Sequence, residues 1–142
     1  MHTDSNIQLP KVLETLIADG VWPNETEAQE SWELVSKEEL SKVVPDEYKI
    51  IFYTPPFYLV SELIESEKDY WLSEEVKIDQ ITPERVLVLG DFGLGSDTVF
   101  ALDYSSCNTN PSVIKLCWNI GWVKISDSFN QFIEDFGFLK NA

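Results

Sequence analysis

The stretch VLVLGDFGLGSDTVFALDY, residues 86–104, decides the fold of this chain together with the shorter runs SVIKLCW (112–118) and WVKI (122–125). Each run is rich in β-branched, aromatic or aliphatic residues, and short turns holding Gly, Asn, Asp, Ser and Pro separate them. Such a pattern is typical of consecutive strands joined by tight turns. We therefore expect an antiparallel meander with strands at Val86–Leu89, Thr98–Tyr104, Ser112–Trp118 and Trp122–Ile125.

A helix is expected after the last of these strands. Ser128 and Gln131 have the spacing of a capping box, which favours a helix start. One face of this helix carries four large apolar residues before Gly137, namely Phe129, Phe132, Ile133 and Phe136. This apolar face predicts that the helix packs on the sheet.

The N-terminal half has the spacing of helices. Leu9, Val12, Leu13, Leu16 and Ile17 predict an amphipathic helix with Pro10 in its first turn and Gly20 at its end. Asn24 with Glu27, and Ser36 with Glu39, have the spacing of two further helix starts.

The middle of the chain changes between strand and helix signals. Tyr48–Thr54 is rich in aromatic and β-branched residues and predicts a strand. Thr54 is then expected to cap a helix that has Pro55 at its first position and continues to about Ser66. Val76–Gln80 is expected to form another strand.

These elements predict one α+β domain over residues 1–142, with a mixed, mostly antiparallel sheet flanked by helices. Its N-terminal helical part covers about 7–66, and its C-terminal sheet and helix cover about 76–137. A chain of this length buries roughly 68–70% of its unfolded surface. With 44% hydrophobic residues it has the material for a core.

The composition restricts the partners. Ten basic and twenty-five acidic residues give a formal charge of −15, which repels nucleic-acid phosphates and anionic lipids. We therefore expect neither direct nucleic-acid binding nor membrane binding. The same charge either speeds encounter with a basic protein or serves solubility alone.

The N-terminal segment and the lack of a long apolar window predict a cytoplasmic protein. Residues 1–5 read MHTDS, with no basic region before an apolar run, and no window approaches the roughly 20 apolar residues of a membrane span. Cys107 and Cys117 have neither the spacing nor the histidine partners of a zinc site. We expect two reduced thiols.

The triplet Asp91-Phe92-Gly93 follows an apolar strand, as the magnesium-binding triplet of protein kinases does. No glycine-rich phosphate loop precedes it, and His2 is the one histidine of the chain, so the sequence excludes a kinase. Ser96 and Cys107 likewise lack a histidine that would activate them as nucleophiles.

Three carboxylates bracket the glycine loop and the strand after it: Asp91, Asp97 and Asp103. If they converge, they would hold a divalent metal and allow metal-assisted hydrolysis. The favoured interpretation is a structural loop, made of Asp91, Gly93, Gly95, Ser96 and Asp97. In it the aspartates accept backbone N–H bonds and the glycines supply positive φ.

Tryptophans and acidic residues are the candidates for contact with a partner. Trp22, Trp118 and Trp122 lie beside turn residues, and tryptophan is enriched at interface hot spots, although core burial is the commoner role. Glu27, Glu30 and Glu33 have helical spacing and form either a solvated face or an acidic docking face.

The order of several motifs resembles the SUKH superfamily, which includes fungal cell-wall assembly regulators of the Smi/Knr type and many bacterial immunity proteins. The motifs are LGDFGLGSD (89–97), LDY (102–104), NPSV (110–113), Trp118, WV (122–123) and SDSFNQF (126–132), with VPDEY (44–48) matching more loosely. The resemblance covers roughly the last 55 residues.

This resemblance implies a mixed sheet with flanking helices, no cofactor, and binding rather than catalysis. Bacterial members commonly neutralise toxins inside the cell, many of which are basic nucleases, so a basic toxin domain is the expected partner. A regulatory scaffold without toxin antagonism remains the alternative. The identity of the toxin and the oligomeric state stay open.

Overall fold

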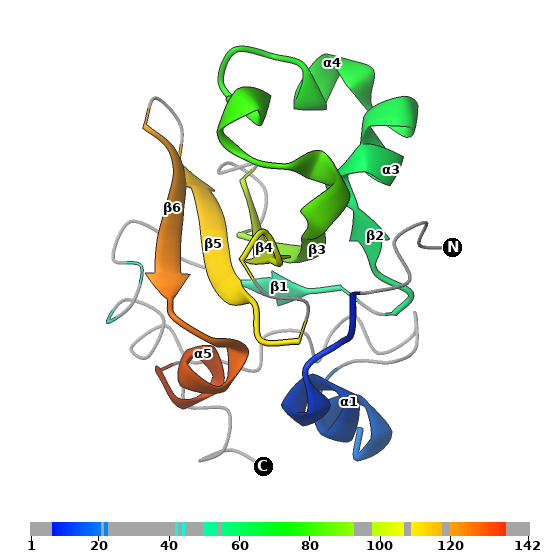
Figure 1. Ribbon diagram of the computed structural model, residues 1–142, viewed down its shortest axis with the longest axis vertical. Coiled ribbons are helices and arrows are strands. Elements are labelled where there is room, and N and C mark those ends of the chain that lie inside the picture. Colours follow the sequence, from blue (N-terminus) through cyan, green and yellow to red (C-terminus); the bar gives the residue numbers. More distant parts are fainter. Residues whose placement is uncertain are drawn as a thin grey trace.

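One sheet with helices on both faces makes up the fold (Figure 1). The computed structural model describes residues 7–20, 22, 42, 44, 50–53, 55–92, 98–106, 109–117 and 120–135. The helices within these residues are α1 (Lys11–Ala18), α3 (Val60–Ser66), α4 (Lys68–Trp71), the 3₁₀ turns η2 (Ile78–Gln80) and η3 (Pro83–Arg85), and α5 (Phe129–Asp135). The strands are β1 (Ile51–Phe52), β2 (Tyr58–Leu59), β3 (Val86–Asp91), β4 (Val99–Asp103), β5 (Ser112–Cys117) and β6 (Gly121–Ser126).

The sheet has the strand order β1-β3-β4-β5-β6, and β2 pairs with β3 alongside β1. Every strand pair among the described residues is antiparallel. The meander expected from the sequence is therefore confirmed as β3 to β6, and the α+β fold class with it. The short strands β1 and β2 lie along successive parts of β3.

Gly90 permits the close approach of β1 to β3. A Cβ atom on Gly90 would lie 2.1 Å from the carbonyl oxygen of Ile51 and 2.5 Å from a ring carbon of Phe100. The register of β3 against β4 also shifts between Val88 and Gly90, as at a β-bulge. Glycine at this position thus fits two neighbours that a larger residue would displace.

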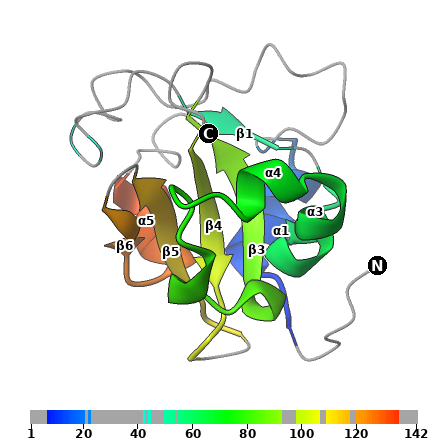
Figure 2. The same ribbon diagram turned by 90° about the horizontal axis from the view of Figure 1, so that it is seen from above.

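The two faces of the sheet bury two separate sets of side chains. On one face the α1–α5 core contains Leu13, Phe100 and Phe132, with contributions from both of those helices. On the other face the α3–α4 core contains Val60 and Trp71. Figures 1 and 2 show α1 and α5 on one side of the sheet and α3 and α4 on the other. Burial on both faces explains why β3 and β4 are almost continuously apolar.

Helix α1 confirms the first predicted helix, except that Pro10 precedes the helix instead of lying in its first turn. It starts after Pro10, buries Leu13 and Leu16, and is followed by Gly20 at φ +78°. Glycine adopts this left-handed conformation at no steric cost, which is why it commonly follows a helix end.

Helix α5 confirms the predicted terminal helix over its described part. The N–H group of Gln131 donates to the Ser128 hydroxyl at 3.2 Å, as expected for an N-cap. Phe129, Phe132 and Ile133 are buried against the sheet. Phe136 and Gly137 lie outside the described residues.

Tyr104, directly after β4, connects the sheet to the segment before α1. Its hydroxyl donates to the carbonyl oxygen of Gln8 at 2.9 Å, and its own carbonyl accepts from Nε of Arg85 at 3.1 Å. The side chain is fully buried, and this burial raises the pKa of the phenol well above its ordinary value.

The predicted helix from Thr54 and Pro55 starts in the wrong place. Tyr58 and Leu59 instead form β2, paired with Val88 and Leu87, and α3 begins at Val60. The Glu62 carboxylate accepts from the Leu59 N–H at 2.8 Å and thereby caps the later start. The predicted end at Ser66 is confirmed.

The predicted strand Val76–Gln80 is wrong, because this segment contains η2 and has Lys77 in the left-handed region at φ 50°. Its apolar residues Val76 and Ile78 join the α3–α4 core instead of a sheet edge. The Val76 carbonyl accepts from the Trp122 indole at 2.8 Å, so side-chain contacts take the place of a strand ladder.

The predicted strand Tyr48–Thr54 is confirmed in its centre, where β1 spans Ile51–Phe52 and the Tyr53 N–H donates to the Leu89 carbonyl at 2.8 Å. Tyr48 and Thr54 lie outside the described residues, as do the helix starts predicted at Asn24 and Ser36.

Candidate partner-binding surface

Trp22 was a candidate for contact with a partner, and the structure corrects this. The side chain is 0% exposed and packs edge-on against Phe52, with ring centroids 4.8 Å apart. Its indole Nε1 donates to the Tyr53 carbonyl at 2.8 Å. A fully buried ring with a satisfied donor is a core residue and cannot meet a partner in this fold.

Trp122 lies at the start of β6 and is partly buried in the α3–α4 core. Its indole Nε1 donates to the Val76 carbonyl at 2.8 Å, and its backbone N–H donates to Oε1 of Gln80 at 2.9 Å. Both donors are therefore used inside the protein. Trp122 fixes residues 76–80 against β6, and the residue as a whole remains partly exposed.

The turn between β5 and β6 exposes an apolar residue that the sequence analysis did not single out. Ile120 is 69% exposed, the largest value among the exposed large hydrophobic residues described. Its N–H donates to the Cys117 carbonyl at 3.2 Å, which closes the turn. Gly121 follows at φ +110° and lies against the Gln80 side chain. The available signal was an isoleucine between Asn119 and Gly121, where turns usually hold polar residues.

The other predicted contact residues fall outside the described part of the chain. These are Glu27, Glu30, Glu33 and Trp118. Four residues of the predicted structural loop also lie outside it, namely Gly93, Gly95, Ser96 and Asp97.

Asp91 is the described member of the predicted loop, and its contacts support a structural role. The Tyr53 hydroxyl donates to Oδ2 of Asp91 at 2.6 Å, joining the ends of β1 and β3. Burial, and after it this hydrogen bond to the carboxylate, raises the pKa of Tyr53 well above its ordinary value. The proton therefore stays on the phenol, and the bond holds at ordinary pH.

Asp91 and Asp103 do not converge on one metal ion. Asp103 lies opposite Val86 in the ladder, at the far end of β3 from Asp91. Five residue-to-residue steps along β3 separate those ends, or roughly 16 Å. Asp103 instead accepts from the Ser105 N–H at 3.0 Å. Within the described residues no group of three His, Cys, Asp or Glu side chains is arranged to hold a metal.

Lys115 is buried on the α1–α5 side of the sheet. Its ammonium lies 4.9 Å from the centroid of Phe92, donates to the Leu116 carbonyl at 3.2 Å, and is 3.3 Å from the sulfur of Cys117. Cys117 is a free cysteine, and Cys107 lies outside the described residues. The ammonium is satisfied by local acceptors and an aromatic face.

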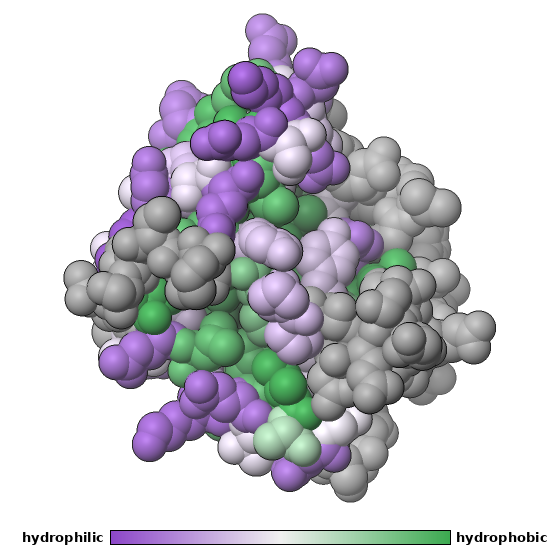
Figure 3. Space-filling view, turned by 90° about the vertical axis from the view of Figure 1, so that its right-hand side faces the viewer, coloured by the Kyte–Doolittle hydropathy of each residue, from purple (hydrophilic) through white to green (hydrophobic). Residues whose placement is uncertain are grey.

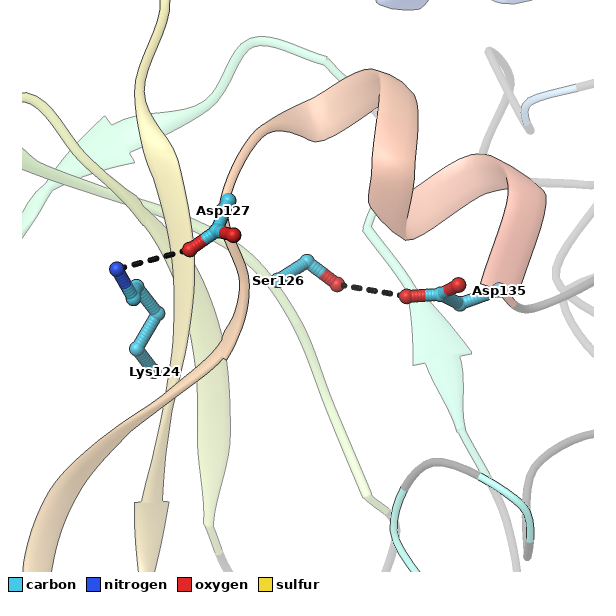
Figure 4. Close-up of polar contacts among 4 residues, drawn as sticks. All are labelled: Lys124, Ser126, Asp127 and Asp135. Atoms are coloured by element: carbon cyan, nitrogen blue, oxygen red, sulfur yellow. Dashed lines mark hydrogen bonds and ion pairs between the residues drawn. The ribbon is translucent and has the colours of Figure 1, made fainter.

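A polar corner joins β6 to α5 (Figure 4). Lys124 and Asp127 form an ion pair at 2.9 Å with both side chains largely exposed. Nearby, the Ser126 hydroxyl donates to Asp135 at 3.5 Å, and the same carboxylate accepts from Gln131 at 2.8 Å. These contacts orient α5 on the sheet, and the exposed ion pair adds little stability.

A comparison with protein-family models, curated proteins and solved structures found no match. Among the described helices, none combines the length and the apolar character needed to cross a bilayer. The candidate surface therefore rests on the geometry of this chain alone.

Proposed function

We propose that this protein is a non-enzymatic, protein-binding domain of the SUKH type, and that it acts as a bacterial immunity protein against a basic toxin domain such as a nuclease. Its proposed place of action is the cytoplasm, where such a toxin would reach its target.

The order of the elements supports the proposal. The glycine-bearing loop precedes β4, which is the central strand of the path β1-β3-β4-β5-β6. Pro111 stands directly before β5, and the tryptophan-bearing β6 leads into the aromatic helix α5. The resemblance implies the same succession of loop, central strand, proline-led strand and aromatic helix.

The observation that carries the proposal is the exposed turn between β5 and β6 on an acidic protein. Ile120 is 69% exposed in a turn that backbone hydrogen bonding closes, so the side chain contributes little to the core. A large exposed apolar residue at the surface suits a protein contact. The charge of −15 would attract a basic partner and speed the encounter.

Co-expression tests this function. The protein is produced in the same cell as the toxin domain encoded next to it, and cell survival and complex formation are measured. We expect survival to depend on this protein and the complex to form faster at low salt. Survival without a complex, or a complex without protection, would contradict the immunity role; the second outcome would favour the regulatory scaffold.

The acidic residues predicted from the sequence provide a second test. Charge reversal of Glu27, Glu30 and Glu33 together should reduce the association rate constant roughly tenfold at low salt, and less at high salt. Stopped-flow association kinetics at two salt concentrations measure this. An unchanged rate would remove these residues from electrostatic steering.

A further inference from the structure

We propose that the turn between β5 and β6 and residues 72–80 form one docking surface, and that it takes a partner segment with an apolar residue flanked by lysines or arginines. We call it the turn surface; it consists of Ile120, the outer part of Trp122, and Glu74, Glu75 and Asp79. The inference rests on the proposed function and names its surface and the chemistry of its partner.

Direct contacts hold the two parts of the turn surface together. Val76 and Gln80 accept the two N–H groups of Trp122 at 2.8 and 2.9 Å. Gln80 also lies so close to Gly121 that an added Cβ would be 2.1 Å from its Oε1. Figures 1 and 2 both show residues 72–80 beside β5 and β6. The carboxylates and the turn therefore keep a fixed relation to each other.

Described contacts hold Ile120 at the end of the turn. A hydrogen bond from its N–H to the Cys117 carbonyl closes the turn, and Gly121 supplies the positive φ that the turn requires. These contacts hold the backbone on either side of the Ile120 side chain, which reduces the conformational entropy lost when a partner buries that side chain. Trp122, half-buried next to it, would extend the apolar contact.

The segment that contacts Trp122 is acidic. Residues 72–80 contain three carboxylates and one lysine, and Glu74, Glu75 and Asp79 are all exposed. These carboxylates are neighbours in sequence of Val76 and Gln80, the two residues that contact Trp122. Figure 3 views the molecule from the side opposite the β5–β6 turn, and it shows hydrophilic residues gathered at the end that carries α3 and α4. Charge complementarity therefore selects a cationic segment and disfavours acidic proteins and nucleic acids.

A peptide titration followed by NMR tests the surface without the natural partner. The probe is a short peptide with one leucine flanked by lysines, added to the ¹⁵N-labelled full chain. The control peptides replace the leucine with serine, or the lysines with glutamates. We expect saturable shifts at residues 72–80 and 120–123, including the Trp122 indole, from the leucine-lysine peptide alone. Shifts spread over other acidic parts of the chain, or equal binding of the serine peptide, would overturn the proposal.

Two variants with matched controls sharpen the test. Ile120→Ser should weaken peptide binding about fivefold, and the triple variant Glu74→Lys, Glu75→Lys, Asp79→Lys roughly tenfold at low salt. Tyr58→Ser removes a different exposed apolar residue, 46% exposed on β2, and should change nothing. Glu14→Lys, Asp19→Lys, Glu134→Lys makes the same change in net charge on exposed positions of α1, its end, and α5. Equal losses in variants and controls would refute the surface.

The outcomes separate this surface from the proposed function. A toxin that binds the wild type and the triple variant equally well would overturn the turn surface and leave the immunity role standing. If the peptide docks at the turn surface but the protein neutralises no toxin, the immunity role would be overturned and the turn surface would stand.

Discussion

Replacing Gly90 with alanine should destabilise this protein more than replacing any other described glycine. The new Cβ would lie 2.1 Å from the Ile51 carbonyl oxygen and 2.5 Å from the Phe100 ring. The first neighbour is backbone, so β1 must move away from β3. The move would break the pairs that Ile51 and Phe52 make with β3 and would uncover Phe52, which is 0% exposed.

The magnitude follows from these losses. Overpacking a dense core costs about 1–3 kcal/mol, and partial exposure of a phenylalanine adds about 1–2 kcal/mol. We expect Gly90→Ala to lower the free energy of unfolding by about 3 kcal/mol, which is roughly a 10 °C drop in Tm for a chain of this size. Gly20→Ala is the matched control, because Gly20 has φ +78° and nothing within 4 Å of an added Cβ. It should cost only about 1 kcal/mol, the conformational penalty of a positive φ.

Urea denaturation followed by tryptophan fluorescence measures both variants, since Trp22 packs on Phe52 and reports on β1. Unchanged m-values would show that the unfolded states are comparable. If Gly90→Ala costs no more than Gly20→Ala, the close approach of β1 does not constrain this position and the reasoning is wrong.

Three further changes test other parts of the structure. Trp22→Ala should lower the free energy of unfolding by about 3–5 kcal/mol in urea denaturation, because it removes a buried ring and its bond to Tyr53; a loss below about 0.5 kcal/mol would mean an exposed residue. Burial raises the pKa of Tyr104, so the folded state keeps a proton that the unfolded chain releases above about pH 10. The stabilising contribution of Tyr104 is therefore complete below pH 10 and falls by up to about 1.4 kcal/mol per pH unit above it. Between pH 8 and 11.5, the free energy of unfolding should decline less steeply in the Tyr104→Phe variant than in the wild type. An identical decline in both proteins would exclude this phenol as the cause. Lys77→Gly should raise the free energy of unfolding by about 0.5 kcal/mol, because lysine holds φ 50° there at a conformational cost; a lower midpoint in thermal denaturation would contradict this.

The elements that the sequence predicted well have their signals within a few residues. Apolar runs between turn residues placed β3 to β6, and Gly20 and Ser128 marked the end of α1 and the start of α5. Periodicity, caps and turn chemistry act locally, so neighbouring residues suffice to recognise them.

The errors arose where a distant partner decided the local structure. The segment after Pro55 has helical spacing, but its first residues pair with Leu87 and Val88 in β3 and form β2 instead. Val76–Gln80 alternates like a strand, yet its carbonyl and side-chain acceptors bond to Trp122. No local pattern distinguishes these outcomes.

The candidate site shows the same division. Residue types in the sequence indicated that tryptophans and acidic residues are candidates for contact, and that Asp91 builds a loop. Whether a given side chain meets solvent depended on the packing around it, which buried Trp22 and left Ile120 exposed.

By itself, the sequence determined an acidic α+β chain with a four-strand meander, a first helix that stops at Gly20 and an aromatic final helix. Only the tertiary structure decided that β1 and β2 both pair with β3 and that Asp91 and Asp103 lie at opposite ends of the β3–β4 pair. It also decided that Trp122 holds residues 76–80 beside an exposed turn. The physical reason is range: helix periodicity, caps and turns are short-range interactions. Strand pairing and burial join residues tens of positions apart, whose contacts exist only once the chain has folded.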